Sequence, residues 1–341
     1  MRVTPLLLLL LIMTFIGHGQ HMRKYLDANL HFTSKKHALY KATAIPDGNR
    51  WVLQAMYPDS GIVLRMFFAD ERLSIKDGPY TIYYSNGKTW MEGHFVNNKA
   101  TDIWQCWYKN GQLRDSGRVD DDHFSGQWKH WYAGGQIKKV HGYGSFPGEY
   151  PTTMQADSSA PAAVVNIIDT LTAGYLTVSG ISDGRWQSWY ENGQPECDGV
   201  ASHGSPAGTW KWFRENGQLS TVETYSQGKI VQLECYDEKG VLTGNACSIL
   251  KPAVFTHPTL SAAQYIARGL RQYSLSRNDV GPVQIRFTVT KTGKIVQLAI
   301  LGLNESVIQY NILQILHTMP AWSPAVSHNR SVDYPVSITV Y

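Results

Sequence analysis

The chain has 341 residues, a formal net charge of +4 and 17% charged residues. This length allows about two domains with a sizeable core. The small charge, carried without any basic run, argues against nucleic acid as a partner.

The N-terminus has the order of a secretory signal. Met1-Arg2 precedes an apolar run from Pro5 to Ile16, and small residues follow at Gly17 and Gly19. A spanning helix needs about 20 apolar residues, whereas runs of about 10 to 14 suit the apolar region of a signal peptide. The sequence therefore predicts a cleaved signal peptide at residues 1–19, and the alternative, a retained membrane anchor, stays open.

Residues 20–75 form a predicted N-terminal capping β segment. Two apolar and aromatic runs, Trp51–Tyr57 and Ile62–Phe68, flank a Pro-Asp-Ser-Gly turn. Such a hairpin would protect the end of a repeat array, which needs a cap.

One pattern then recurs five times, in a first run of three copies and a second run of two. Within each run the copies begin 24 residues apart. Each copy begins with an aromatic residue, has a second aromatic residue three positions on, and reaches a glycine seven positions on, usually preceded by Asn. A tyrosine column, four positions on, fails only at Arg214. The five copies begin at Tyr80, Trp104, Trp128, Trp186 and Trp210, and their glycines are Gly87, Gly111, Gly135, Gly193 and Gly217.

These columns predict stacked β-hairpins. Aromatic residues favour strands, and Asn-Gly between two strands is typical of a type I′ turn. Alternation along a strand would place Trp186 and Tyr190 on one face and Trp189 on the other. Burying one Trp is worth about 4 to 6 kcal/mol as an upper bound, so the aromatic residues can join neighbouring hairpins. The alternative, an aromatic face that binds sugars or lipids, stays open.

The phrase Gly-x-Trp-x-x-Trp-Tyr-x-Asn-Gly resembles the MORN-repeat variant of exported and antitoxin-labelled bacterial proteins. The resemblance covers about residues 50–245. It implies an elongated antiparallel sheet used for binding or scaffolding, and it implies no chemistry. We place the repeats at residues 76–250, with a Pro-, Ser- and Thr-containing inserted loop near residues 145–163.

Residues 251–341 predict a small α+β domain. A capping box at Ser261 begins a helix whose Ala262, Ile266, Leu270 and Tyr273 share one face. A hairpin follows, with strands at Val283–Val289 and Ile295–Leu301 and a turn at 291–294. A second helix from about Glu305 ends at Pro320, and Tyr334–Tyr341 is a last strand.

This order of elements resembles the C-terminal domain of TonB. The Met-Pro-Ala-Trp-Ser-Pro-Ala phrase at 319–325 is its most specific part, and Tyr334-Pro-Val-Ser-Ile closes it. The resemblance implies recognition of a segment of an outer-membrane receptor by strand addition. It places the partner-binding edge at Val336, Ser337, Ile338, Thr339 and Val340.

The sequence has no recognisable catalytic, cofactor-binding or metal-binding motif. The acidic run at 120–122 is better explained as a solvated turn between repeats than as a cation site. Among the four cysteines, Cys235 and Cys247 are nearest in sequence and form the candidate disulfide. Unpaired buried thiols are the alternative.

The sequence therefore predicts a mainly β array of antiparallel hairpin repeats followed by an α+β domain. The predicted function is non-catalytic recognition by an exported protein, periplasmic or outer-membrane associated, with an envelope protein as partner. The protein would need no cofactor and would have no transmembrane segment after signal cleavage. An alternative is an energy transducer for TonB-dependent uptake, which requires the N-terminal apolar segment to remain in the membrane. A hydrolase acting on envelope glycans would need paired carboxylates in a cleft, which the sequence does not indicate.

Overall fold

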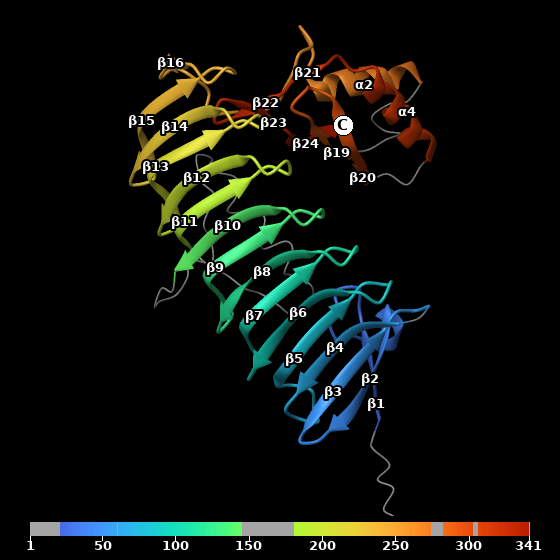
Figure 1. Ribbon diagram of the computed structural model, residues 1–341. Helices are drawn as coiled ribbons and strands as arrows, with labels where there is room; N and C mark the ends of the chain where they lie inside the picture. Colours follow the sequence, from blue (N-terminus) through green and yellow to red (C-terminus); the bar gives the residue numbers. More distant parts are fainter. Residues whose placement is uncertain (1–20, 60, 145–180, 274–281, 303–305, 341) are drawn as a thin grey trace, which may run out of the picture. The chain divides into compact units, whose positions relative to one another are not determined.

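The computed structural model describes residues 21–59, 61–144, 181–273, 282–302 and 306–340. Sixteen strands, β1 to β16, form one sheet in which each strand neighbours those before and after it in sequence (Figure 1). A small α+β region follows, so the predicted fold class is confirmed. The predicted signal peptide and the predicted inserted loop lie outside the described residues.

The chain divides into two compact units. The described parts of the first are 21–59, 61–136 and 143–144, and those of the second are 137–142, 181–273, 282–302 and 306–340. The first unit holds a short 3-10 helix, η1 (Lys35–His37), and nine complete strands. These are β1 (Met22–Leu26), β2 (Tyr40–Asp47), β3 (Arg50–Met56), β4 (Ile62–Phe68), β5 (Lys76–Tyr83), β6 (Thr89–Val96), β7 (Lys99–Trp107), β8 (Leu113–Asp120) and β9 (His123–Trp131). Most of β10 (Ile137–Gly144) belongs to the second unit.

The second unit continues the sheet and adds the C-terminal domain. Its remaining sheet strands are β11 (Ile181–Trp189), β12 (Pro195–Ser202), β13 (Ser205–Phe213), β14 (Leu219–Ser226), β15 (Lys229–Tyr236) and β16 (Leu242–Gly244). The rest is β17 (Leu250–Lys251), β18 (Val254–Phe255), α2 (Ala262–Gln272), β19 (Val283–Val289), β20 (Ile295–Leu301), α4 (Ser306–His317), β21 (Trp322–Ser323), β22 (Ala325–Ser327), β23 (Arg330–Val332) and β24 (Tyr334–Val340).

The repeated Asn-Gly turns differ from the predicted type I′. The glycines, such as Gly87 and Gly193, have positive φ, but the preceding Asn86 and Asn192 do not. The asparagine side chain instead accepts a hydrogen bond from the amide two residues on, at 3.1 Å for Asn86 and 3.0 Å for Asn192. This local bond favours a turn with one left-handed residue, which only the glycine supplies. The type I′ prediction at Asn-Gly is therefore wrong.

Two-residue turns with positive φ at both positions lie at the other ends of the strands. Asn97 and Asn98 join β6 to β7, and Asp121 and Asp122 join β8 to β9. Asn and Asp tolerate the left-handed region better than other non-glycine residues. The chain thus alternates two turn types along the array.

Side chains do not alternate between the two faces of the sheet as far as Tyr190, contrary to the prediction. In the copy that begins at Trp186, the register shifts between Ser188 and Trp189, and β11 ends at Trp189. Tyr190 therefore lies beyond the strand, and both Trp189 and Tyr190 are half-buried. A β-bulge of this kind re-aims the side chains that follow it.

Tryptophan packing joins one hairpin to the next. The indole of Trp104 is fully buried and contacts the rings of Tyr80 and Phe95 from the preceding hairpin, with centroids 5.7 and 5.4 Å apart. Beneath it lies Gly93, at which an added Cβ would stand 2.2 Å from the indole. Gly117 under Trp128 and Gly199 under Trp210 repeat this arrangement. The repeat therefore needs a tryptophan on one strand and, facing it on the neighbouring strand, a glycine.

Two hydrogen-bond ladders explain the Tyr-x-Asn-Gly part of the motif. The hydroxyls of three repeat tyrosines donate to a backbone carbonyl of the next hairpin, as Tyr84 does to Trp107 at 2.8 Å. Asn86 Nδ2 likewise donates to the Lys109 carbonyl at 3.2 Å. The other pairs are Tyr108 with Trp131, Tyr190 with Phe213, Asn110 with Ala133 and Asn192 with Glu215. These residues are thus accounted for by stacking of the repeats.

The C-terminal domain packs two helices on a three-stranded sheet of order β20-β19-β24. The predicted capping box is present, with Ser261 Oγ accepting from the Gln264 amide at 3.2 Å. The buried face of α2 contains Ala262, Ile266 and Leu270, and that of α4 contains Ile308, Ile312, Ile315 and Leu316. Among the described residues, no helix is long and apolar enough to cross a membrane.

Candidate binding surfaces

The residues predicted to bind a partner lie in β24. Ile338 and Val340 are buried in the domain core, and Val336 packs against that core. Ser337 and Thr339 are exposed on the opposite face. The predicted edge therefore offers two exposed side chains and its backbone, whereas its apolar side chains already support the fold.

The two edge strands of this sheet differ in regularity. β24 pairs with β19 through seven consecutive residues without a register shift. β20 pairs with the other side of β19, but its register shifts between Arg286 and Thr288, and Gln297 has φ of +54°. A bulge disrupts an edge for further pairing. Of the two edge strands of this sheet, β24 is therefore the more regularly paired.

The cysteines fall into two chemical classes. Cys235 on β15 and Cys247 form a disulfide, with their Cα atoms 6.1 Å apart. Cys106 and Cys197 are free and buried, and burial raises the pKa of each thiol to about 12. A thiol reacts as the thiolate, so neither free cysteine is suited to nucleophilic chemistry.

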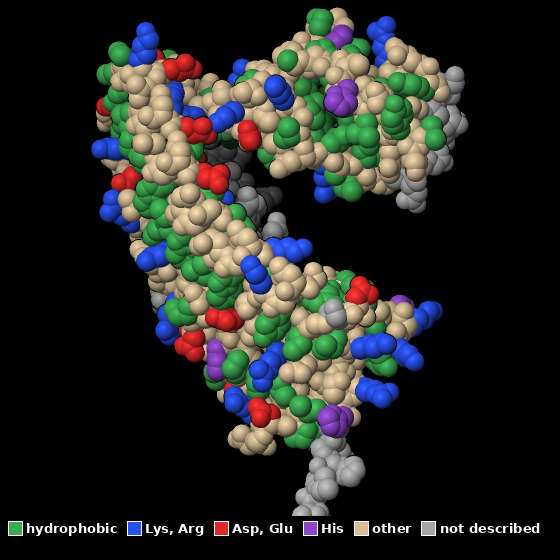
Figure 2. Space-filling model, turned by 45° about the vertical axis from the view of Figure 1, so that its right-hand side comes forward, with side chains coloured by type: hydrophobic (Ala, Val, Ile, Leu, Met, Phe, Trp, Pro, Cys, Tyr) green, Lys and Arg blue, Asp and Glu red, His purple; other side chains and the backbone are tan. Residues whose placement is uncertain are grey.

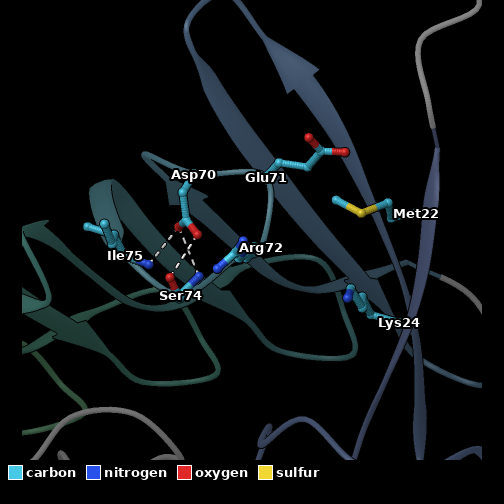
Figure 3. A pocket seen from close by; sticks show the side chains of 7 residues that line it. All are labelled: Met22, Lys24, Asp70, Glu71, Arg72, Ser74 and Ile75. Carbon is cyan, nitrogen blue, oxygen red and sulfur yellow. Dashed lines mark hydrogen bonds between the residues drawn. The ribbon is translucent and has the colours of Figure 1, made fainter.

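A surface hollow lies beside the loop that follows β4 (Figure 3). In that loop the Asp70 carboxylate accepts hydrogen bonds from Ser74 Oγ at 2.7 Å and from the Ile75 amide at 2.7 Å. Desolvation acts to raise the pKa of Asp70, but these hydrogen bonds outweigh it and lower the pKa. Asp70 therefore stabilises the loop. The other lining residues are Met22, Lys24, Glu71 and Arg72, whose mixed charges specify no ligand.

The acidic run of the sequence also has a structural role. The Asp122 carboxylate accepts a hydrogen bond from the Ala100 amide at 2.7 Å and lies 3.2 Å from Lys99 Nζ.

A second acidic side chain in this part of the sheet is also paired. The carboxylate of Asp115 on β8 lies 2.7 Å from His130 Nδ1 on β9. Within the described residues, no group of three or more metal-ligating side chains could hold a metal ion.

A cluster that the sequence analysis did not anticipate lies where the β22–β23 turn meets the last two repeats. The turn consists of His328 and Asn329, both with positive φ, and all of these elements belong to the second unit. The His328 ring stacks on Trp212, with centroids 3.6 Å apart and planes inclined by 8°. The repeats also bond the turn backbone, because Ser220 Oγ donates to the His328 carbonyl at 2.8 Å.

Glu223 is the charged centre of this cluster and is fully buried. Its carboxylate lies 2.8 Å from His328 Nδ1 and accepts hydrogen bonds from Tyr225 at 2.6 Å and Thr221 at 2.7 Å. Burial acts to raise the pKa of Glu223, but these hydrogen bonds and the charge of His328 outweigh burial and lower the pKa below its ordinary value. The carboxylate is therefore ionised at neutral pH.

Arg330, directly after the turn, is held by a second set of groups. Its Nη1 donates to the Tyr190 hydroxyl at 2.6 Å and to the Phe213 carbonyl at 3.0 Å, and lies 3.5 Å from the Glu196 carboxylate. Its guanidinium also stands 5.0 Å from the centre of the Trp212 ring. Hydrogen bonds, a carboxylate and an aromatic face together match the chemistry of arginine.

Departures from the repeat pattern mark this cluster in the sequence. Glu223 stands 13 residues after Trp210, where Gly93, Gly117 and Gly199 stand in other copies. Arg214 replaces the ladder tyrosine and donates to the carbonyls of Tyr236 and Asn329, at 3.0 and 3.1 Å. The failed tyrosine column was therefore the signal that a different partner contacts the last repeat.

Comparison with known families supports the repeat assignment. Three segments, residues 76–97, 182–199 and 207–227, match the model of the MORN repeat variant family. They coincide with hairpins β5–β6, β11–β12 and β13–β14. No curated protein matches the chain. MORN repeats suggest a binding or scaffolding repeat protein, and proteins of this family are generally non-catalytic.

Proposed function

We propose that the protein is an exported, non-catalytic binding protein of the cell envelope. The repeat array serves as a scaffold, and the C-terminal domain recognises a segment of an envelope protein by strand addition at β24. The observation that carries the proposal is the uninterrupted seven-residue register of this edge strand, combined with exposed Ser337 and Thr339.

The surface of the C-terminal domain supports a binding role. Its α4 has apolar side chains on the outer side as well as the core side, with Val307 71% and Tyr310 60% exposed. Figure 2 shows hydrophobic side chains gathered on the face of this domain that the view presents. Exposed apolar surface of this kind is common at protein interaction sites.

Site-specific photocrosslinking tests strand addition directly. A photoreactive amino acid at Ser337 or Thr339 should crosslink an envelope protein in intact cells. The same amino acid at exposed Gln297, on the irregular edge strand β20, is the matched control and should give less product. Equal crosslinking at all three positions, or none at β24, would contradict the proposal.

N-terminal sequencing of the mature protein separates the proposal from energy transduction. A chain that begins at Gln20 supports export with cleavage and rules out a transducer that depends on a retained anchor. A chain that retains residues 1–19 would instead support the transducer.

A further inference from the structure

We propose that the last two repeats carry a binding site for a basic β-turn that presents an imidazole and a guanidinium. In the structure the chain's own His328–Arg330 turn occupies this site, and turns of other proteins can displace it. The site comprises the Trp212 ring face, the carboxylates of Glu223 and Glu196, and the Tyr190 hydroxyl. Its residues lie on the repeats, and none of them belongs to β24.

The array side of the contact is complementary to a basic turn in both charge and hydrogen bonding. Its acceptors face the basic side chains, with Glu223 beside His328 and the Phe213 carbonyl beside Arg330. Its donors face the turn backbone, where Ser220 bonds the His328 carbonyl and Arg214 bonds the Asn329 carbonyl. A short turn therefore satisfies both sets of groups.

The repeat is modified at the positions that make these contacts. In three of the other four copies the position of Glu223 is a glycine that admits the next tryptophan, and in the copy that begins at Trp128 it is His141. The position of Arg214 is a tyrosine in all four. After Trp210 the ring stack continues through Trp212 to His328, with centroids 5.8 and then 3.6 Å apart. The turn thus extends the ring stack of the last repeat with the imidazole of His328.

The chemistry of the contact favours exchange. It consists largely of charged and polar groups, which water can solvate again when the turn leaves, as in transient interfaces. The only other ion pair between these parts in the described residues, Lys291 with Glu215 at 2.6 Å, is about half exposed. Exposed pairs of this kind add little stability. The docked turn also leaves the buried Nε1 of Trp212 without a hydrogen-bond acceptor.

The test uses the full chain with the site emptied by the double substitution His328→Ala and Arg330→Ala. The probe is a fluorescently labelled cyclic peptide with the sequence of residues 325–332, and binding is measured by anisotropy. We expect saturable binding that is at least about tenfold tighter for the emptied chain than for the wild type. A peptide with the Arg330→Gln exchange, and the emptied chain with Glu223→Gln added, should each bind at least about tenfold more weakly.

The proposal would be overturned if the emptied chain has the circular dichroism spectrum of the wild type but shows no saturable binding of the peptide. It would also be overturned if the peptide binds the emptied chain and the wild type equally tightly. If the emptied chain does not fold, hydrogen exchange in the wild-type chain tests the proposal instead. Excess unlabelled peptide should accelerate hydrogen exchange in residues 325–332 of the wild type, and unchanged exchange would show that the turn is a permanent contact. Neither result affects strand addition at β24, because the two sites share no residue.

Discussion

The packing of tryptophan on glycine can be tested at Gly117. The φ of Gly117 lies outside the left-handed region, so alanine fits the backbone, but its Cβ would lie 2.1 Å from Cδ2 of Trp128. The indole must move, and overpacking of this kind costs about 1 to 3 kcal/mol. Movement also weakens the hydrogen bond from Trp128 Nε1 to the Arg118 carbonyl, now 3.0 Å long, worth about 1 kcal/mol. We expect Gly117→Ala to lower the free energy of unfolding by about 2 to 4 kcal/mol.

The assay is equilibrium urea unfolding followed by far-UV circular dichroism and tryptophan fluorescence. The control is Gly126→Ala, where no atom lies within 4 Å of the added Cβ but φ is +60°, so only backbone strain of about 1 kcal/mol is expected. In a Trp128→Leu background the Gly117→Ala cost should fall below about 1 kcal/mol, because the clash is gone. A cost that stays the same in that background would refute the reasoning.

Further predictions concern the ladders and the titratable groups. Tyr84→Phe removes the hydroxyl that bonds the Trp107 carbonyl and should cost about 0.5 to 1.5 kcal/mol in thermal unfolding, whereas no loss would mean that the ladder is not stabilising. Because the pKa of Glu223 is lowered on folding, its contribution is complete above the ordinary value of 4.5 and is lost as pH falls through the folded pKa. Unfolding of the wild type should therefore become easier below about pH 4.5, and Glu223→Gln should flatten this part of the pH profile. Iodoacetamide at pH 8 should leave Cys106 and Cys197 unmodified in the native protein, because the pKa of each is raised to about 12. Rapid alkylation of either would contradict their burial.

The repeat sheet could be predicted from the sequence because its information is local and periodic. Aromatic residues at a constant step specify strands, and glycine after asparagine specifies a turn. The C-terminal helices were equally accessible, since a capping box and apolar spacing begin and orient α2 within about three turns of chain. The turn type was predicted wrongly at Asn-Gly because the asparagine side chain bonds its own backbone, as Asn86 does with the Lys88 amide.

The packing of tryptophan on Gly93, Gly117 and Gly199, and the cluster at the β22–β23 turn, depend on tertiary structure and could not be predicted from the sequence. Gly117 lies 11 residues from Trp128 in sequence, and only the pairing of β8 with β9 places the ring over it. Glu223 and His328 are 105 residues apart and lie in different parts of the chain. Periodicity fixes which residues share a strand face, because that relation is set by backbone geometry over a few residues. It does not fix which distant turn contacts the last repeat, because that contact joins residues such as Glu223 and His328 that are 105 positions apart in sequence.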